Sequence, residues 1–172
     1  MDGTQDFEMT SFLPGPGAER QYRDALGLFG TGVTIVTAQG PDGPVAITAN
    51  SFSSVSLTPA LVLWSVDLKS DRCPVFRDAS FSAIHVLDEG QADLALHFAK
   101  NGRAFDGVDW ILSEEGVPLL GGCLARFECE TVADHPGGDH RILVSQVLRV
   151  TRSDGAPLLF AKGGFGRFAR RD

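Results

Sequence analysis

A run of small polar residues between two apolar segments is the stretch of this sequence whose residue types and spacing best suit ligand binding. Five hydroxyl or amide side chains crowd into it: Thr48, Asn50, Ser51, Ser53 and Ser54. Small side chains let a backbone approach a ligand closely, and N–H and O–H groups can hold a phosphate or the edge of a polar ring. The same residues also suit an ordinary polar crossover between two core strands. Taken alone, they leave both interpretations open.

A glycine-rich segment, Asp134 to His140, carries a second set of candidate groups. An imidazole can donate or accept a hydrogen bond near neutral pH, and the neighbouring Asp139 can fix the tautomer of His140. A metal site built on His135 and His140 is disfavoured, because no third ligand is in sight. We therefore expect a glycine-rich turn without a bound metal, at which His140 is available for hydrogen bonding.

A third candidate is the polar segment before Pro74. Ser70 or Asp71 is expected to cap a short helix that tolerates Pro74 in its first turn. The N–H groups of such a helix start, together with Arg72, could bind a phosphate. The alternative is a solvated cap with a surface arginine.

Local patterns predict the elements that position these residues. Apolar residues at helical spacing from Tyr22 to Phe29 predict a helix that ends at Gly30 or Gly32. A β-hairpin follows, because two β-rich segments flank the turn Gly40 to Gly43, and its second strand ends in the polar run. Strands are predicted at Val33–Ala38, Pro44–Ala49, Leu61–Val66, Phe81–Leu87, Cys123–Val132, Arg141–Val150 and Pro157–Ala161, and a second long helix is predicted by the stripe Gln91, Leu94, Ala95 and Phe98.

Three side chains that could carry chemistry are expected to be structural instead. His85 lies inside a predicted strand and should be hydrogen-bonded there, and Trp110 should pack in the core. Cys129 falls on the apolar face of an alternating strand and should be buried and inert. The opposite face of that strand is polar and is expected on the surface of the sheet: Arg126, Glu128 and Glu130.

The composition is that of an acidic globular protein. Its 172 residues, 43% of them hydrophobic and 22% charged, predict one domain over residues 21–172, preceded by a flexible arm over residues 1–20. A net charge of −7 argues against nucleic acid or an anionic membrane surface as partner. Three cysteines without a Cys-x-x-Cys spacing argue against disulfides and zinc. No secretory signal and no apolar run of ~20 residues are visible, so we expect a cytoplasmic protein.

The polar run belongs to a longer pattern, Thr-Ala-Asn-Ser-Phe-Ser-Ser-Val-Ser-Leu-x-Pro, over residues 48–59. Phe-x-Thr-Gly-Val-Thr-x-Val-Thr precedes it over residues 29–37, and Gly-Asp-His stands at residues 138–140. With these patterns the chain resembles, from about Tyr22 to Phe165, the flavin reductase family with the split-barrel FMN-binding fold. The resemblance implies an antiparallel split β-barrel of six or seven strands with short helices. It also implies a homodimer with the flavin near the interface.

The same resemblance implies an activity, hydride transfer from NADH or NADPH to FMN or FAD. Because the cofactors carry this chemistry themselves, no catalytic acid, base or nucleophile is expected, and none of the standard catalytic motifs appears. The resemblance further implies that reduced flavin is supplied to a separate monooxygenase. The alternatives are an electron carrier that retains FMN and a flavin-binding protein without turnover.

The residues that hold the two cofactors are implied by the resemblance as well. Lys100 and Arg103 are the candidates for neutralising a flavin phosphate; the alternative is that they complement the helix C-terminal dipole, worth ~0.3–1 kcal/mol. Arg72 stands where the family carries a second hydroxyl, and Phe165 stands where it carries a tyrosine. The implied flavin set is Ile47, Thr48, Ala49, Asn50, Ser51, Ser54, Ser65, Val66, Asp67, Ser70, Arg72, Phe98, Lys100 and Arg103, and the implied nicotinamide set is Asp139, His140 and Phe165.

Overall fold

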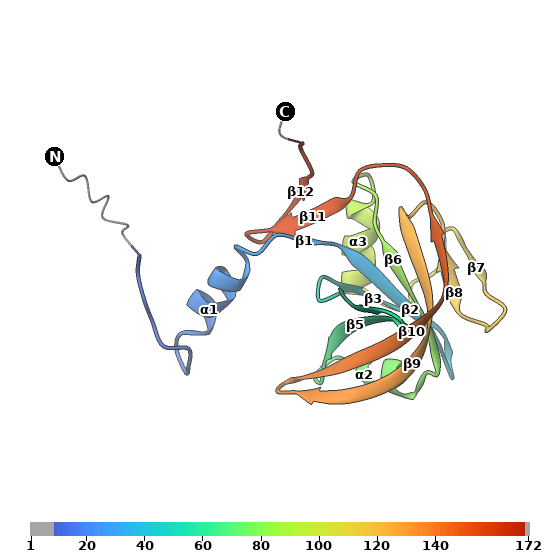
Figure 1. The fold of residues 1–172 in the computed structure, drawn as a ribbon, viewed down its shortest axis with the longest axis horizontal. Coiled ribbons are helices and arrows are strands. Elements are labelled where there is room, and N and C mark those ends of the chain that lie inside the picture. The colour runs from blue at the N-terminus through green and yellow to red at the C-terminus, as the bar shows by residue number, and fades with distance from the viewer. Residues whose placement is uncertain (1–8, 171–172) are drawn as a thin grey trace.

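The computed structural model describes residues 9–170, which form a mainly β protein with three short helices (Figure 1). The helices are α1 (Glu19–Leu26), α2 (Cys73–Asp78) and α3 (Ala92–Lys100). The strands are β1 (Thr31–Gly32), β2 (Thr34–Gly40), β3 (Gly43–Ala49), β4 (Ser53–Leu57), β5 (Ala60–Asp67), β6 (Phe81–Val86), β7 (Trp110–Leu112), β8 (Pro118–Leu120), β9 (Ala125–Gly137), β10 (His140–Arg152), β11 (Leu158–Ala161) and β12 (Gly164–Arg167).

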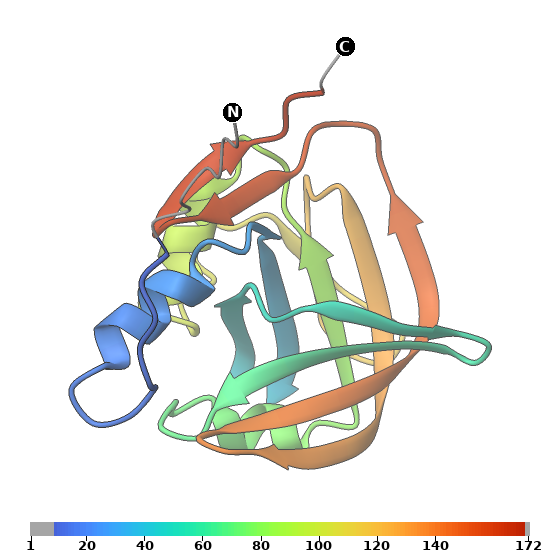
Figure 2. The same cartoon turned by 60° about the vertical axis from the view of Figure 1, so that its left-hand side comes forward.

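Seven antiparallel strands make the main sheet, in the order β3-β2-β6-β9-β10-β5-β4. The sheet is strongly curved (Figure 2). Its two edge strands, β3 and β4, follow one another in the chain, but within the described residues no ladder of hydrogen bonds joins them. The architecture is therefore mainly β and antiparallel, and its sheets are not closed.

The main sheet has seven strands, in agreement with the expected six or seven, and the described residues form twelve strands in all, five more than the seven segments predicted as strands. The additional strands β1, β4, β7, β8 and β12 contain two to five residues each, too few to show a periodicity in the sequence. Two small sheets result, with the orders β1-β11-β12 and β7-β8. The first of them places the C-terminal strands beside the start of the β2–β3 hairpin.

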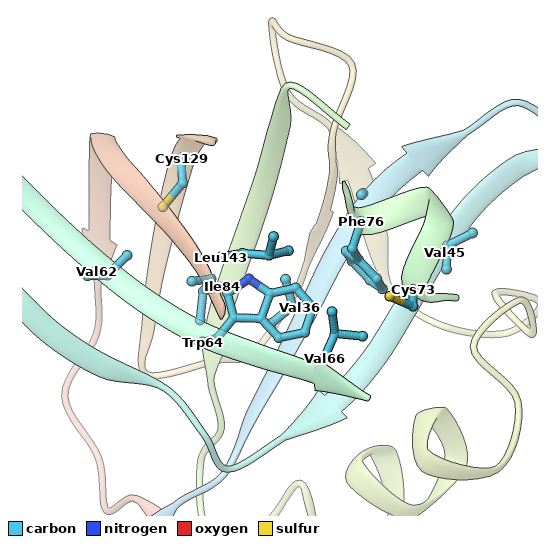
Figure 3. Packing of buried hydrophobic residues seen from close by; sticks show 11 residues of the cluster. Val36, Val45, Val62, Trp64, Val66, Cys73, Phe76, Ile84, Cys129 and Leu143 are labelled. Atoms are coloured by element: carbon cyan, nitrogen blue, oxygen red, sulfur yellow. The ribbon is translucent and has the colours of Figure 1, made fainter. Parts of the chain in front are cut away.

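The main core fills the inside of the curved sheet around Trp64 (Figure 3). The indole packs edge-on against Phe76 of α2, with the ring centroids 5.0 Å apart. A second cluster lies under α3, where Phe98 and Trp110 both pack against Phe105, as predicted for Trp110. These clusters hold α2 and α3 against the sheet and so determine where the ends of both helices lie.

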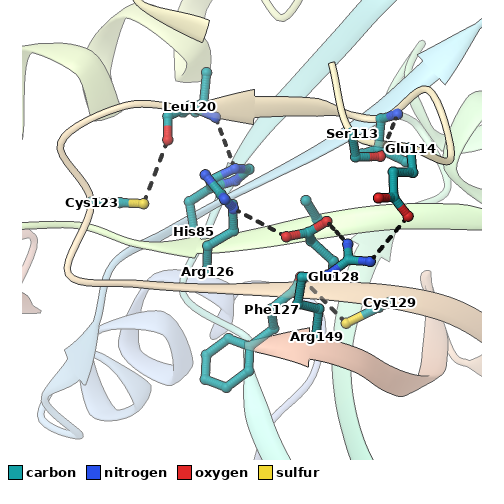
Figure 4. Close-up of polar contacts among 12 residues, drawn as sticks. His85, Ser113, Glu114, Leu120, Cys123, Arg126, Phe127, Glu128, Cys129 and Arg149 are labelled. Atoms are coloured by element: carbon teal, nitrogen blue, oxygen red, sulfur yellow. Dashed lines mark hydrogen bonds and ion pairs between the residues drawn. The ribbon is translucent and has the colours of Figure 1, made fainter. Parts of the chain in front are cut away.

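His85 is structural, as predicted. Its ring is fully buried, with Nδ1 3.0 Å from the carbonyl oxygen of Ile35 and Nε2 3.0 Å from the backbone nitrogen of Leu120 (Figure 4). The Leu120 N–H can only donate, so Nε2 accepts and Nδ1–H donates to Ile35. Burial lowers the pKa of His85 to about 4, which keeps this ring neutral.

The polar face of β9 is only partly on the surface: Glu130 is exposed, as predicted, whereas Arg126 is half-buried and Glu128 is buried. Glu128 is only 5% exposed and accepts a 2.6 Å hydrogen bond from Arg149 Nη1 (Figure 4). Arg126 Nε lies 3.5 Å from the same carboxylate. The segment that carries β7 and β8 folds over this side, so that Glu115 also lies within 3.9 Å of Arg149. The positive charges of Arg149 and Arg126 compensate the buried carboxylate of Glu128, which explains how this side of β9 tolerates it.

Several boundaries also differ from the sequence-based expectations. α1 begins at Glu19, inside the predicted arm, and stops before Gly27; residues 1–8 of the arm lie outside the described part of the chain. The N-cap of α2 is Arg72, whereas Ser70 or Asp71 was expected, because Ser70 Oγ instead accepts from the backbone nitrogen of Arg72. β9 continues to Gly137, so the turn before His140 is much shorter than predicted.

The cysteines, the hydropathy and the possible metal ligands add three observations. Cys73, Cys123 and Cys129 are free thiols, and burial raises the pKa of Cys129 to about 12, in agreement with the inert role predicted for it. Among the described residues no helix is long and apolar enough to cross a membrane. The same residues contain no group of three side chains that could hold a metal ion.

Candidate functional site

A pocket of about 250 Å³ lies where the end of β3 meets α3 and the β11–β12 hairpin. Its walls are mostly apolar, and the start of the polar run, Thr48 to Asn50, forms one side of it. The structure thus brings the most suggestive stretch of the sequence to a cavity. The lining residues are Val33, Thr48, Ala49, Asn50, Ala95, Leu96, Ala99, Phe160 and Phe165.

The backbone of β3 presents polar groups to this pocket because β3 is an edge strand. Ala46 N–H donates to Gly102 O at 2.8 Å, so Ala46 points its backbone groups away from β2. In an antiparallel ladder this orientation recurs at every second residue. Thr48 therefore also directs its N–H and C=O groups outward, where it lines the pocket beside Asn50, the first residue after β3.

Side-chain hydrogen bonds fix the polar run in place. Thr48 Oγ1 donates to Ala95 O at 2.6 Å and joins β3 to α3. Ser51 Oγ donates to Ser65 O at 3.0 Å and accepts from Ser65 N at 2.9 Å. The second pair ties the chain that leaves β3 to β5, across the gap between the two ends of the main sheet.

The predicted phosphate ligands gather near the C-terminal end of α3. Lys100 is exposed and, with Leu96, His97 and Ala99, lines an open depression that shares Leu96 and Ala99 with the pocket. Arg103 follows, also exposed. Arg72 reaches the same helix end, where its guanidinium donates to carbonyls of Phe98 and Ala99. Ser70 is one turn before α2 and hydrogen-bonds the backbone of Arg72.

Some implied flavin residues have side chains outside the pocket. Phe98 and Val66 are buried in the two core clusters, and Ile47 packs against the first of them. Ser54 lies on exposed strand β4, and Asp67 Oδ1 accepts from Lys69 N at 2.8 Å. These residues line none of the pocket's surface.

The implied nicotinamide set is divided between two places. His140 Nδ1 lies 2.7 Å from Asp139 Oδ1, and this hydrogen bond lowers the pKa of Asp139. His140 pairs with Asp67 at the end of β5, two residues beyond Ser65. Phe165, by contrast, lines the pocket and packs edge-on against Phe160 at 5.6 Å.

Five lining residues were not predicted: Val33, Ala95, Leu96, Ala99 and Phe160. Ala95 and Ala99 lie one helical turn apart, and small residues at that spacing allow another group to approach a helix closely. That spacing was a usable signal. The sequence contains no such signal for Val33 and Phe160, because both have the pattern of ordinary core-strand residues.

An apolar pocket edged by outward-facing backbone amides and adjoined by two exposed cations suits a flat heteroaromatic ring that carries a phosphate. Residues 26–169 match the flavin reductase like domain family, so the chain belongs to that family. The chain is 54% identical over 160 residues to an NADH-dependent FMN reductase, SmoA, of Agrobacterium fabrum, covering 93% of this chain and 92% of the relative.

Two further comparisons agree. The reductase component of the flavin-dependent trigonelline monooxygenase of Acinetobacter baylyi is 43% identical, over 85% of this chain and 48% of that relative. The NADH:FAD oxidoreductase SgcE6 of Streptomyces globisporus, solved with NAD and FAD fragments, superposes with a TM-score of 0.86 at 41% identity, covering 92% of this chain and 98% of that one.

Proposed function

We propose that this protein is a flavin reductase that transfers hydride from NADH to FMN or FAD. The observation that carries the proposal is the pocket in which the outer edge of β3 faces the small residues of α3. The relatives that match nearly the whole chain are named as NADH-dependent reductases of FMN or FAD. NADPH is the less favoured donor.

The residues of the pocket fit a flavin. Leu96, Val33 and Phe160 supply apolar surface for the faces of a fused ring, and Ala95 and Ala99 leave room beside it. The backbone groups of β3 face the same space, where they hydrogen-bond the polar edge of the ring and stabilise negative charge that develops on it. Lys100 and Arg103 neutralise the phosphate beyond the helix end.

Bound flavin supplies the chemistry, since it accepts hydride from the nicotinamide and passes the electrons on. The chain's own residues bind and orient the flavin and the nicotinamide dinucleotide, and they exclude water from the site. His140, with its ring held by Asp139, hydrogen-bonds the nicotinamide dinucleotide, and Phe165 forms part of the pocket wall. No side chain has to move a proton for hydride transfer.

The architecture we propose is a split barrel, in which the main sheet nearly closes on itself. The Ser51–Ser65 hydrogen bonds support it, because they join the chain after β3 to β5, the strand next to the opposite edge strand β4. The domain covers residues 21–172, and a cytoplasmic location stays a prediction.

We also propose a homodimer. None of the residues of α1 is buried, and the helix lies outside the curved sheet in both views (Figures 1 and 2). Tyr22, Leu26, Leu28 and Phe29 are between 47% and 79% exposed. An apolar surface of this kind is stable in water when a second copy covers it. Analytical ultracentrifugation checks the mass, and a monomer at micromolar concentration contradicts the proposal.

The electrons are delivered, in our proposal, to a separate monooxygenase by reduced flavin that leaves the site. The pocket supports release, because it adjoins the open surface depression that Lys100 lines. Some relatives are named as reductase components of such systems. An electron carrier would instead keep its FMN.

The deciding experiment measures the loss of NADH absorbance with purified protein and added FMN, FAD or riboflavin in turn. Rapid oxidation that saturates with one flavin supports the reductase and identifies its preferred substrate. Protein that purifies yellow and gains little from added flavin supports the carrier. Absence of oxidation with every flavin contradicts the proposed function.

A further inference from the structure

The guanidinium of Arg72 joins three elements of the fold. Its side chain is 12% exposed, although the residue lies at the surface-facing start of α2. Nη1 donates to Phe98 O at 2.8 Å and to Ala46 O at 3.3 Å, and Nη2 donates to Ala99 O at 3.3 Å. The first and third acceptors belong to the last turn of α3, and Ala46 belongs to the edge of β3.

The chain at Gly102 is packed directly against this contact. A Cβ added to Gly102 would collide with the carbonyl oxygen of Ala46 and would lie 2.7 Å from Arg72 Nε. Gly102 O also accepts the 2.8 Å hydrogen bond from Ala46 N. The guanidinium, the segment after α3 and the edge of β3 therefore form one close-packed junction with no space for a side chain.

This junction adjoins the candidate flavin pocket, with which it shares Ala99. β3 contributes Thr48, Ala49 and Asn50 to the pocket, and α3 contributes Ala95, Leu96 and Ala99. Ala99 itself both lines the pocket and accepts from Arg72. The separation of the two walls thus depends on the hydrogen bonds that Arg72 makes to both elements.

We propose that Arg72 is a positioning residue that sets the distance between the β3 and α3 walls of the flavin pocket, and that it does not bind the flavin phosphate. The inference rests on the proposed function, because it concerns the same pocket. Its two terminal nitrogens make three hydrogen bonds to protein carbonyls, so both are already directed at the protein. α2 has only six residues, so its dipole adds little attraction for a phosphate. Lys100 and Arg103, which are exposed, carry out that task.

Riboflavin distinguishes the two roles, because it has the ring of FMN without the phosphate. We would titrate wild type, Arg72→Met and Arg72→Lys with riboflavin and with FMN, following flavin fluorescence. If Arg72 is a positioning residue, each variant loses affinity for riboflavin and for FMN by the same factor. For the methionine variant we expect this factor to be about tenfold or more. A phosphate ligand predicts unchanged riboflavin binding and weaker FMN binding, with much of the FMN affinity kept by the lysine variant. That second result would overturn the inference.

Lys100→Met is the matched control, and it should weaken FMN binding while leaving riboflavin binding unchanged. Hydrogen exchange on the flavin-free protein gives an independent readout. Arg72→Met should speed exchange of the amides of the last turn of α3, and Gly102→Ala should do the same with the arginine present. If hydrogen exchange is unchanged in both variants, the positioning role of Arg72 is wrong, and the proposed function is not affected. Failure of wild type to bind either flavin would overturn the proposed function instead.

Discussion

The hydroxyl group of Thr48 donates a 2.6 Å hydrogen bond to the backbone carbonyl of Ala95. Thr48 opens the polar run, and Ala95 lies in the middle of α3 with its side chain fully buried. Both residues line the pocket. One hydroxyl therefore links the strand wall to the helix wall, and its removal tests how far the site depends on that link.

Thr48→Val removes the hydrogen bond and keeps the shape of the side chain. We expect the free energy of unfolding to fall by about 1 kcal/mol, the typical net contribution of such a bond. Flavin affinity should fall as well, because the pocket wall loosens. Urea unfolding and flavin titration measure the two effects. Thr48→Ser keeps the hydroxyl and should stay close to wild type; equal losses in both variants would contradict the role assigned to this bond.

His85 predicts a pH dependence of stability. Burial lowers its pKa from 6.5 to about 4 in the folded protein. Between these two values the unfolded chain binds a proton that the folded chain does not, so stability falls as the pH drops through this window and levels off below it. The loss amounts to about 3 kcal/mol.

The comparison with His85→Asn isolates this contribution, since asparagine does not titrate. We expect the stability difference between wild type and the variant to change in favour of the variant as the pH is lowered from 6.5 to 4. Denaturant unfolding at a series of pH values measures it. A difference that is constant over this range would show that His85 is not the group responsible.

Glu128 is predicted to be essential for stability. Glu128→Ala leaves Arg149 and Arg126 without their shared carboxylate, and breaking a buried pair costs about 3–5 kcal/mol. Arg149 is 45% exposed and can be partly solvated, so we expect a value near the lower limit. Flavin affinity of the folded variant should stay unchanged, because the cluster shares no residue with the pocket. Thermal unfolding and flavin titration check both statements; a variant as stable as wild type would contradict the first.

His140→Ala should raise the Michaelis constant for NADH more than it weakens flavin binding. His140 lies at the hairpin tip, outside the pocket that we assign to the flavin. Steady-state kinetics with varied NADH, together with a flavin titration, separate the two effects. Asp139→Asn keeps an acceptor for the imidazole and should have a smaller effect. Equal weakening of both ligands, or no change in either, would remove His140 from the donor site.

Asp134 is predicted to hold the hairpin that carries His140. Its carboxylate accepts from Arg141 Nε at 2.6 Å and from Arg77 Nε of α2 at 3.0 Å, and the two arginines lower its pKa. Asp134→Ala should speed hydrogen exchange at the tip of the β9–β10 hairpin and raise the Michaelis constant for NADH, less than His140→Ala does. The clamp is present at neutral pH and is lost as the pH falls through the lowered pKa. Exchange rates identical to wild type would contradict the role.

Local features were sufficient to predict part of this structure. The hairpin of β2 and β3 was predicted in the right place, because β-branched runs and a glycine turn act over a few neighbouring residues. The structural role of His85 followed from its place inside a predicted strand, and the buried thiol of Cys129 followed from strand periodicity. The motif at Thr48 to Ser51 pointed to a wall of the pocket. A polar run at the end of a strand can be recognised in the local sequence, without knowing where the strand lies in the fold.

By itself, then, the sequence determined the strand order of the hairpin, the polar run at its end and membership of a flavin reductase family. Only the tertiary structure decided which partners meet across the chain. Arg72 reads locally as a helix-start cation, yet its acceptors lie 26 and 27 residues away in the sequence. Glu128 reads as a surface residue, yet a distant hairpin buries it. Such roles depend on long-range packing, and no pattern among neighbouring residues encodes them.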